Sequence, residues 1–164
     1  ITFAHLEPLR LNVVKIETVS GYKAPLKAPN VDHLFQITPE RALKNWARDR
    51  LAATGAKGNA RFVIKNAAAT ESKLKIDKGF TGQFKKELSE RYTVFIEAEL
   101  QVTDAAGAVR AQASAKAERS RTITEDASLN QREKLWHDIT RAAMADFNGA
   151  MERAIKGHFK GWLN

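Results

Sequence analysis

The feature that most constrains the fold of this chain is a strict alternation of apolar and polar side chains in its second half. In residues 92–102 every second residue is apolar, and the same alternation returns in residues 109–117. Successive side chains of a β-strand point to opposite faces, so each segment is predicted to be a strand with one buried face. Turn-forming residues at 104–107 lie between the two segments, which predicts an antiparallel hairpin.

Two helices are predicted from their capping signals. Thr38 precedes Pro39, an order typical of a helix start, because threonine caps free backbone amides and proline suits the first helical position. Apolar residues then recur at helical spacing, and Gly55 is the predicted stop. The run that starts at Ser128 has the capping-box pattern, so a second and longer helix is expected to continue to about residue 163.

The remaining segments complete the predicted fold. Further strands are expected at residues 11–19 and from residue 61 towards residue 76, and a short helical turn is expected at residues 80–88. The order β-α-β-β-β-α predicts an α+β two-layer sandwich, in which an antiparallel four-stranded sheet carries both main helices on one face. With 43% hydrophobic residues, the whole chain of residues 1–164 is expected to form a single domain.

The sequence contains no recognisable catalytic pattern. Its four histidines form none of the spacings typical of metal ligands, and it has no cysteine. No serine lies in a nucleophile elbow. The glycines at residues 55–58 lack the lysine and hydroxyl residue that end a phosphate loop. We therefore expect no catalytic, cofactor-binding or metal-binding residues, and we expect that the protein is not an enzyme.

Two acidic residues lie on the polar side of the predicted hairpin. Glu97 and Glu99 alternate with apolar residues, so both side chains are expected to face solvent. Across the hairpin, Arg110 and Lys116 are candidate partners that would neutralise them. We expect replacement of either glutamate by glutamine to change the stability by no more than about 0.5 kcal/mol.

The chain carries a formal net charge of +8. This excess favours an anionic partner, which could be an acidic envelope protein, an anionic lipid surface or nucleic acid. Most aromatic side chains belong to predicted buried stripes and are not free for base stacking, so nucleic acid is the least favoured. The alternative is that the charges only solvate the surface. The candidate contacts with an anionic surface are Lys44, Arg48, Arg50, Arg119 and Arg121.

Two of these candidates break the alternation of their strand. Arg119 and Arg121 fall on the side of the strand that is apolar as far as Ala117. Either a bulge shifts the register after Ala117, or the strand continues beyond the end of the hydrophobic core. A specific anion site is a third interpretation.

The chain resembles a group of short bacterial envelope lipoproteins trimmed of their lipidated N-terminus. The resemblance rests on the runs at residues 31–35, 45–51, 89–92 and 119–122. The element order is also similar to that of the LPS-assembly lipoprotein and of the auxiliary lipoproteins of envelope lipid transporters. This resemblance implies a removed signal peptide and a lipidated cysteine before Ile1, and therefore a periplasmic protein anchored to a membrane. It carries no catalytic or binding residues over to this chain.

Three hypotheses for the function follow. The first is a non-enzymatic, periplasmic adaptor or accessory domain that binds another envelope component through its open sheet face or sheet edge. The second is a carrier that holds an acyl chain between the alanine-rich strand and the final helix, which requires a cavity of at least ~300 Å³. The third is a basic module for RNA or another polyanion, whose affinity would fall steeply with salt. The ligand and the oligomeric state stay open.

Overall fold

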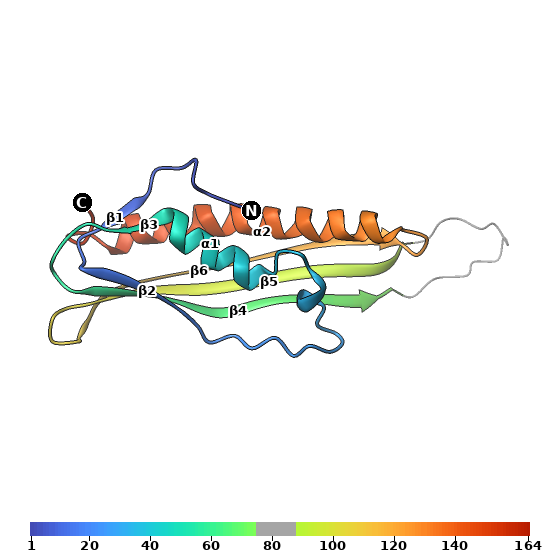
Figure 1. Cartoon of the computed structure of the whole chain (residues 1–164), viewed down its shortest axis with the longest axis horizontal. Coiled ribbons are helices and arrows are strands. Elements are labelled where there is room, and N and C mark those ends of the chain that lie inside the picture. Colours follow the sequence, from blue (N-terminus) through green and yellow to red (C-terminus); the bar gives the residue numbers. More distant parts are fainter. Residues whose placement is uncertain (75–87) are drawn as a thin grey trace.

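The computed structural model describes residues 1–74 and 88–164, and Figure 1 shows a layer of helices lying along one face of a sheet. A 3₁₀ turn, η1, lies between the second strand and the first helix. The elements are β1 (Leu9–Leu11), β2 (Lys15–Ser20), η1 (Asp32–Leu34), α1 (Pro39–Arg50), β3 (Leu51–Ala53), β4 (Asn59–Lys73), β5 (Leu88–Thr103), β6 (Val109–Thr124) and α2 (Leu129–His158).

The main sheet has four strands in the order β2-β4-β5-β6, and it is mixed. The pairs β4–β5 and β5–β6 are antiparallel, as expected, but β2 and β4 run parallel. The prediction of a wholly antiparallel sheet is therefore wrong at this edge. The reason is that α1 connects β2 to β4 as a crossover, which returns the chain to the same end of the sheet before the next strand begins.

The predicted strand at residues 11–19 is two strands. The amide of Val13 donates to the carbonyl of Leu11 at 2.8 Å, and this tight turn separates β1 from β2. β1 then pairs in parallel with β3 as a small second sheet. This pairing also explains why α1 ends at Arg50 and not at Gly55, because Leu51 already has the extended conformation of β3.

Gly55 has a packing role in place of the predicted helix-stopping role. A Cβ atom at this position would lie 1.8 Å from the side-chain oxygen of Asn12, so only glycine allows the chain after β3 to pass the turn between β1 and β2. The predicted helical turn at residues 80–88 lies outside the described residues except at Leu88, which is the first residue of β5.

The predicted caps and hairpin are confirmed. The Thr38 hydroxyl accepts from the amide of Arg41 at 3.1 Å, and Ser128 forms both capping-box bonds with Gln131. Residues 104–107 form the turn between β5 and β6. α2 ends at His158, a few residues before the predicted end, because the last residues leave the helix and Leu163 forms a bridge with Leu11.

The core fills the space between the two layers. α2 packs mainly on β6 and β5, and α1 packs mainly on β4. On β6 the inward-facing residues are small, and they are buried beneath the larger side chains of α2. These small residues are Ala111, Ala113, Ala115 and Ala117. Under α1, the ring of Trp46 lies 5.4 Å from Phe62 and 5.2 Å from Phe147, so both helices share one core.

Candidate functional site

A groove runs along the outer edge of the sheet between β2 and α1. We call it the β2–α1 groove. Its volume is about 320 Å³. Its lining residues are Ile16 and Thr18 of β2, Lys44, Ala47 and Arg48 of α1, and Leu51 of β3. Its floor is therefore mostly apolar, and its rim on the helix side carries two cationic side chains.

The groove follows from the way the chain crosses over. α1 lies mainly above β4, so the helix-facing side of the neighbouring edge strand β2 is only partly covered (Figure 1). Ile16 is half-buried and Thr18 is exposed, whereas Ala47 and Leu51 are buried. Ala47 has a small side chain, so α1 leaves space for the groove at this position.

The edge of β2 beside this groove has no partner strand among the described residues. The amide of Gly21 donates to the carbonyl of Ile64 at 2.9 Å, just after β2 ends. Backbone groups of a strand alternate between its two sides, so the amides of Thr18 and Ile16 face away from β4. The residues whose side chains line the groove therefore also offer their backbone groups at the open edge.

The two cations of the groove each have an acidic neighbour on α1. Lys44 pairs with Glu40 at 3.2 Å, one turn earlier, and Arg48 pairs with Asp49 at 2.9 Å. The side chains of Lys44 and Arg48 remain 51% and 67% exposed. The Lys44–Glu40 pair is exposed enough to contribute little to stability. Arg48 is held more firmly, because the Asp49 side chain is only 6% exposed and the guanidinium also donates to Asn45 at 3.2 Å.

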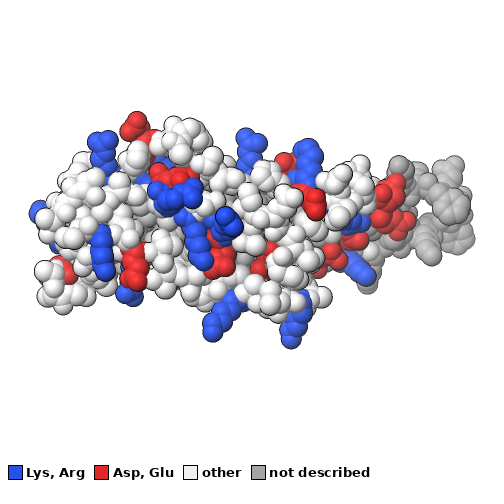
Figure 2. Space-filling view, viewed as in Figure 1, with Lys and Arg blue, Asp and Glu red and all other residues white. Residues whose placement is uncertain are grey.

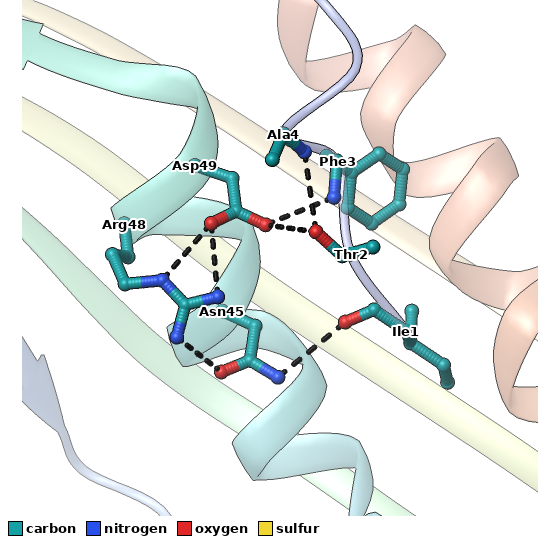
Figure 3. Close-up of polar contacts among 7 residues, drawn as sticks. All are labelled: Ile1, Thr2, Phe3, Ala4, Asn45, Arg48 and Asp49. Atoms are coloured by element: carbon teal, nitrogen blue, oxygen red, sulfur yellow. Dashed lines mark hydrogen bonds and ion pairs between the residues drawn. The ribbon is translucent and has the colours of Figure 1, made fainter.

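Asp49 is shared between Arg48 and the N-terminal segment, as Figure 3 shows. Its carboxylate accepts from the Thr2 hydroxyl and from the Phe3 amide, both at 2.9 Å. Burial opposes ionisation, but these two bonds and the contact with Arg48 together lower the pKa of Asp49. Asn45 adds a bond from its amide to the carbonyl of Ile1 at 3.4 Å. The start of the described chain is thus tied to α1.

Arg50, a predicted surface contact, lies inside the protein. It is only 2% exposed, and its guanidinium donates to the Glu7 carbonyl, to Asn148 at 3.1 Å and to Glu152 at 2.7 Å. Lys156 also contacts Glu152, and these two cations lower the pKa of that carboxyl. Arg50 therefore joins α1 to α2 and is not available to an external anion.

Arg119 and Arg121 lie on β6, the opposite edge of the sheet. The pairing of β5 with β6 continues without a shift at these residues, so no bulge intervenes. Both arginines are exposed, although their partners on β5, Val94 and Tyr92, are buried, so the core continues beneath β5 and leaves only the edge strand uncovered. Arg119 reaches α2 and forms two bonds with Asp146, at 2.6 and 3.0 Å. This contact lowers the pKa of Asp146. Of the predicted contacts, the structure places Lys44 and Arg48 together beside the β2–α1 groove, and Arg119 and Arg121 together at the opposite edge of the sheet.

Figure 2 shows basic and acidic side chains interspersed over the visible face, with no large area of one sign. Among the described residues, no group of three or more histidine, aspartate or glutamate side chains is placed to hold a metal ion.

A second hollow of about 290 Å³ lies beside the start of α2 and has Phe35 and Trp136 in its lining. These two rings stack on each other at 5.0 Å.

The sequence pattern missed a buried carboxylate on the other face of the sheet. Glu99 is only 4% exposed, and Lys65 of β4 lies 2.7 Å from it. The bond from Lys65, with further bonds from Gln101 and Gln112, lowers the pKa of Glu99 against the opposing effect of burial. The expected partner Arg110 pairs with Asp104 instead. Glu99 is covered by the long polar side chains of Lys65, Gln101 and Gln112, which lie on three adjacent strands. The alternation of apolar and polar residues along one strand does not predict such cover.

A second polar cluster surrounds the hydroxyl of Tyr92 near the start of α2. This hydroxyl lies 2.7 Å from Glu71, 3.2 Å from Glu90 and 3.1 Å from Arg132, and Arg132 also pairs with Glu90. Burial and the bond with Glu71 raise the pKa of Tyr92. The phenol therefore stays protonated at neutral pH, which suits a tether between the sheet and α2 and not a catalytic base.

Among the described residues, no helix is both long and apolar enough to cross a membrane.

Comparison with protein-family models and with curated proteins finds no match. Among solved structures, the chain is similar to a minor lipoprotein from Acinetobacter baumannii, with 15% identity, a TM-score of 0.45 and coverage of 92% of this chain and 95% of that chain. It is also similar to rare lipoprotein B from Shewanella oneidensis, with 10% identity, a TM-score of 0.38 and coverage of 87% and 92%. Both of these proteins are named as lipoproteins.

Proposed function

We propose that this chain is a non-enzymatic domain of a bacterial envelope protein, periplasmic and anchored to a membrane through a segment that precedes Ile1. In this proposal it is an adaptor, and it holds a partner protein along the open edge of β2. The observation that carries the proposal is the combination of an unpaired strand edge with the β2–α1 groove directly beside it.

Strand addition is the binding mode that this combination supports. An extended segment of a partner can pair its backbone with an exposed sheet edge, while every second side chain enters a neighbouring pocket. Here the backbone bonds would be made to the edge of β2, and the alternate side chains would meet α1. Pairing supplies affinity for any extended segment, and the groove supplies the selection between sequences.

The other two hypotheses receive less support. A carrier needs a cavity between the alanine-rich strand and α2, but neither of the two hollows described above is lined by an alanine of β6. A polyanion module needs a face of free cations, whereas Arg50 and Arg119 are committed to carboxylates of α2. A membrane-surface role has the same difficulty, because Arg50 is buried and the exposed candidates are divided between the two edges of the sheet.

Site-specific photocross-linking in cells tests the adaptor function. A benzophenone amino acid replaces Glu17, whose exposed side chain lies on β2, in the full-length precursor expressed in its own host. We expect one discrete adduct in the envelope fraction. The same amino acid at Lys116, on the edge strand β6, is the control position and should give none.

Two substitutions at Thr18 make the test specific for the strand edge. Thr18→Pro removes the amide that faces the open edge, a place where an edge strand tolerates proline, and we expect it to abolish the adduct. Thr18→Val keeps the amide and should retain the adduct. An adduct that survives Thr18→Pro in a folded protein would contradict strand addition, and recovery of the protein in the cytosol would contradict the envelope assignment.

A further inference from the structure

We propose that the segment received by the β2–α1 groove is an acidic peptide, with glutamate or aspartate side chains at the positions that face α1. This inference rests on the proposed function, because it specifies the chemistry of the partner at the same edge. It is argued from the spacing of the groove cations, from their charge and from the apolar floor.

The spacing of the two cations matches that of a strand. Lys44 and Arg48 are four residues apart on α1, which places them about 6 Å apart along the helix. In an added strand, the side chains on one face recur every second residue, about 6.6–6.8 Å apart. α1 runs back along the sheet above β2 and β4 (Figure 1), so two successive groove-facing side chains can each meet one cation.

The charge of the groove favours carboxylates at those two positions. Its lining holds two cationic residues and no acidic one. Glu40, the neighbour of Lys44, is partly exposed, and Asp49, the neighbour of Arg48, shares its carboxylate with Thr2 and Phe3. Because the side chains of Lys44 and Arg48 are 51% and 67% exposed, a carboxylate from a partner can approach each cation beside its present partner.

The floor of the groove suits the rest of such a side chain. Ile16, Ala47 and Leu51 present apolar surface between the backbone edge of β2 and the charged rim. The methylene groups of a glutamate lie over this surface while its carboxylate reaches Lys44 or Arg48. A lipid phosphate would use the two cations but would leave both the apolar floor and the edge amides without a role, so a peptide fits more of the site.

Fluorescence anisotropy with three labelled peptides tests this inference. Each is a nine-residue peptide with threonine at alternate positions, and the two central groove-facing residues are glutamate, glutamine or lysine. We expect the glutamate peptide to bind about tenfold more tightly than the glutamine peptide, the sum of two exposed ion pairs. We expect the lysine peptide to bind more weakly than both, and high salt to reduce the glutamate preference.

A double variant isolates the two groove cations. Lys44→Gln with Arg48→Gln should remove the preference for the glutamate peptide and leave the affinity for the glutamine peptide unchanged. The matched control is Arg110→Gln with Lys116→Gln, which removes the same charge from the opposite part of the sheet. Equal affinities for the three peptides, or a preference for the lysine peptide, would overturn the acidic assignment.

The same assay separates the failure of this inference from the failure of the proposed function. If all three peptides bind equally and Thr18→Pro abolishes their binding, the strand edge is used and only the acidic chemistry is wrong. If no peptide binds, or if Thr18→Pro leaves their binding unchanged, both proposals fail. Binding to phosphatidylglycerol vesicles in place of any peptide, lost in the Lys44→Gln, Arg48→Gln variant, would assign the groove to a membrane surface and also overturn the inference.

Discussion

The two edges of the sheet are built differently. β6 is 16 residues long, and beyond Ala117 its helix-facing side carries Arg119 and Arg121, with Arg119 bound to Asp146 of α2. β2 has only 6 residues, and its helix-facing side carries Ile16 and Thr18 beside an open groove. The long edge is interrupted by charge, and the short edge is unpaired beside a groove.

Charged side chains that point inward are a known way to prevent an edge strand from pairing with another chain. On β6 this protection lies where the edge strand is exposed while its neighbour β5 is still buried. On β2 no charged side chain points towards the helices, and protection comes from the short length of the strand and from Lys15 and Glu17 on its other face. We therefore expect association to be prevented at β6 and, under the proposed function, to occur at β2.

The largest effect that we predict concerns α2, which covers the inner face of β6. Trp136 is 7% exposed, stacks on Phe35 at 5.0 Å and meets the ring of Tyr92 edge to face at 5.6 Å. We expect Trp136→Ala to lower the free energy of unfolding by about 3–5 kcal/mol in urea denaturation. Trp162→Ala, at a half-buried tryptophan beyond α2, should cost less. An unchanged midpoint for Trp136→Ala would contradict the packing of α2 on the sheet.

The next effect concerns α1, which forms the wall of the β2–α1 groove. Arg50→Met removes the buried cation that joins α1 to Glu152 of α2, and we expect a loss of about 2–3 kcal/mol, reduced from that of a fully buried pair because Glu152 is partly exposed. Lys156→Gln removes the exposed cation on the same carboxylate and should cost no more than about 0.5 kcal/mol. If Arg50→Met and Lys156→Gln lower the free energy of unfolding equally, burial of Arg50 does not strengthen its ion pair with Glu152.

Much of this fold could be predicted from local patterns. The hairpin of β5 and β6 follows from side-chain alternation, and both helix starts follow from their capping residues. The parallel pairing of β2 with β4 was missed, although a strand, a helix and a strand in succession favour it. The separation of residues 9–20 into β1 and β2 depends on the pairing of β1 with β3, which is distant in sequence. No local pattern in residues 9–20 predicts this separation.

The candidate site was predictable only in part. Lys44 and Arg48 were identified by charge, but charge alone also selected Arg50, which is buried. A helix places residues 44 and 48 on one flank, whereas residue 50 falls on the side that meets α2. The groove itself depends on how far α1 covers β2, which is a property of tertiary packing. The sequence therefore indicated the right helix and could not identify the groove.

A smaller effect is expected on the outer face of the sheet, midway between the two edges. Glu99→Gln should cost about 1–2 kcal/mol at pH 7, because it weakens buried bonds to a charged group, whereas Glu97→Gln should change stability by less than about 0.5 kcal/mol. The larger loss for Glu99→Gln replaces the stability change of no more than about 0.5 kcal/mol that was expected from the sequence. Equal effects of the two substitutions would indicate that Glu99 is solvated like its neighbour.

The pH dependence of this pair of variants follows from the direction of the pKa shift. The pKa of Glu99 is lower in the folded protein, so the unfolded chain binds more protons as the pH falls towards the ordinary carboxyl range. The stability that Glu99 contributes is therefore present above its unfolded pKa and is lost as the pH falls through its folded pKa. The gap between wild type and Glu99→Gln should narrow on acidification, as measured by urea midpoints at several pH values.

The smallest effect on stability is expected at β6, but it bears most directly on the comparison of the two edges. Arg119→Val with Arg121→Val removes the inward charges from the exposed end of the strand and restores an uninterrupted alternation from residue 109 to residue 123. The thermal midpoint should change little, because Arg119 meets Asp146 at the surface. Self-association, measured by sedimentation at rising concentration, should instead appear or increase, because nothing then interrupts pairing along the strand.

The matched Arg119→Lys, Arg121→Lys variant keeps the charges and should sediment as the wild type does. If the valine variant also behaves like the wild type, the arginines do not protect this edge, and the contrast between β2 and β6 must rest on the groove alone.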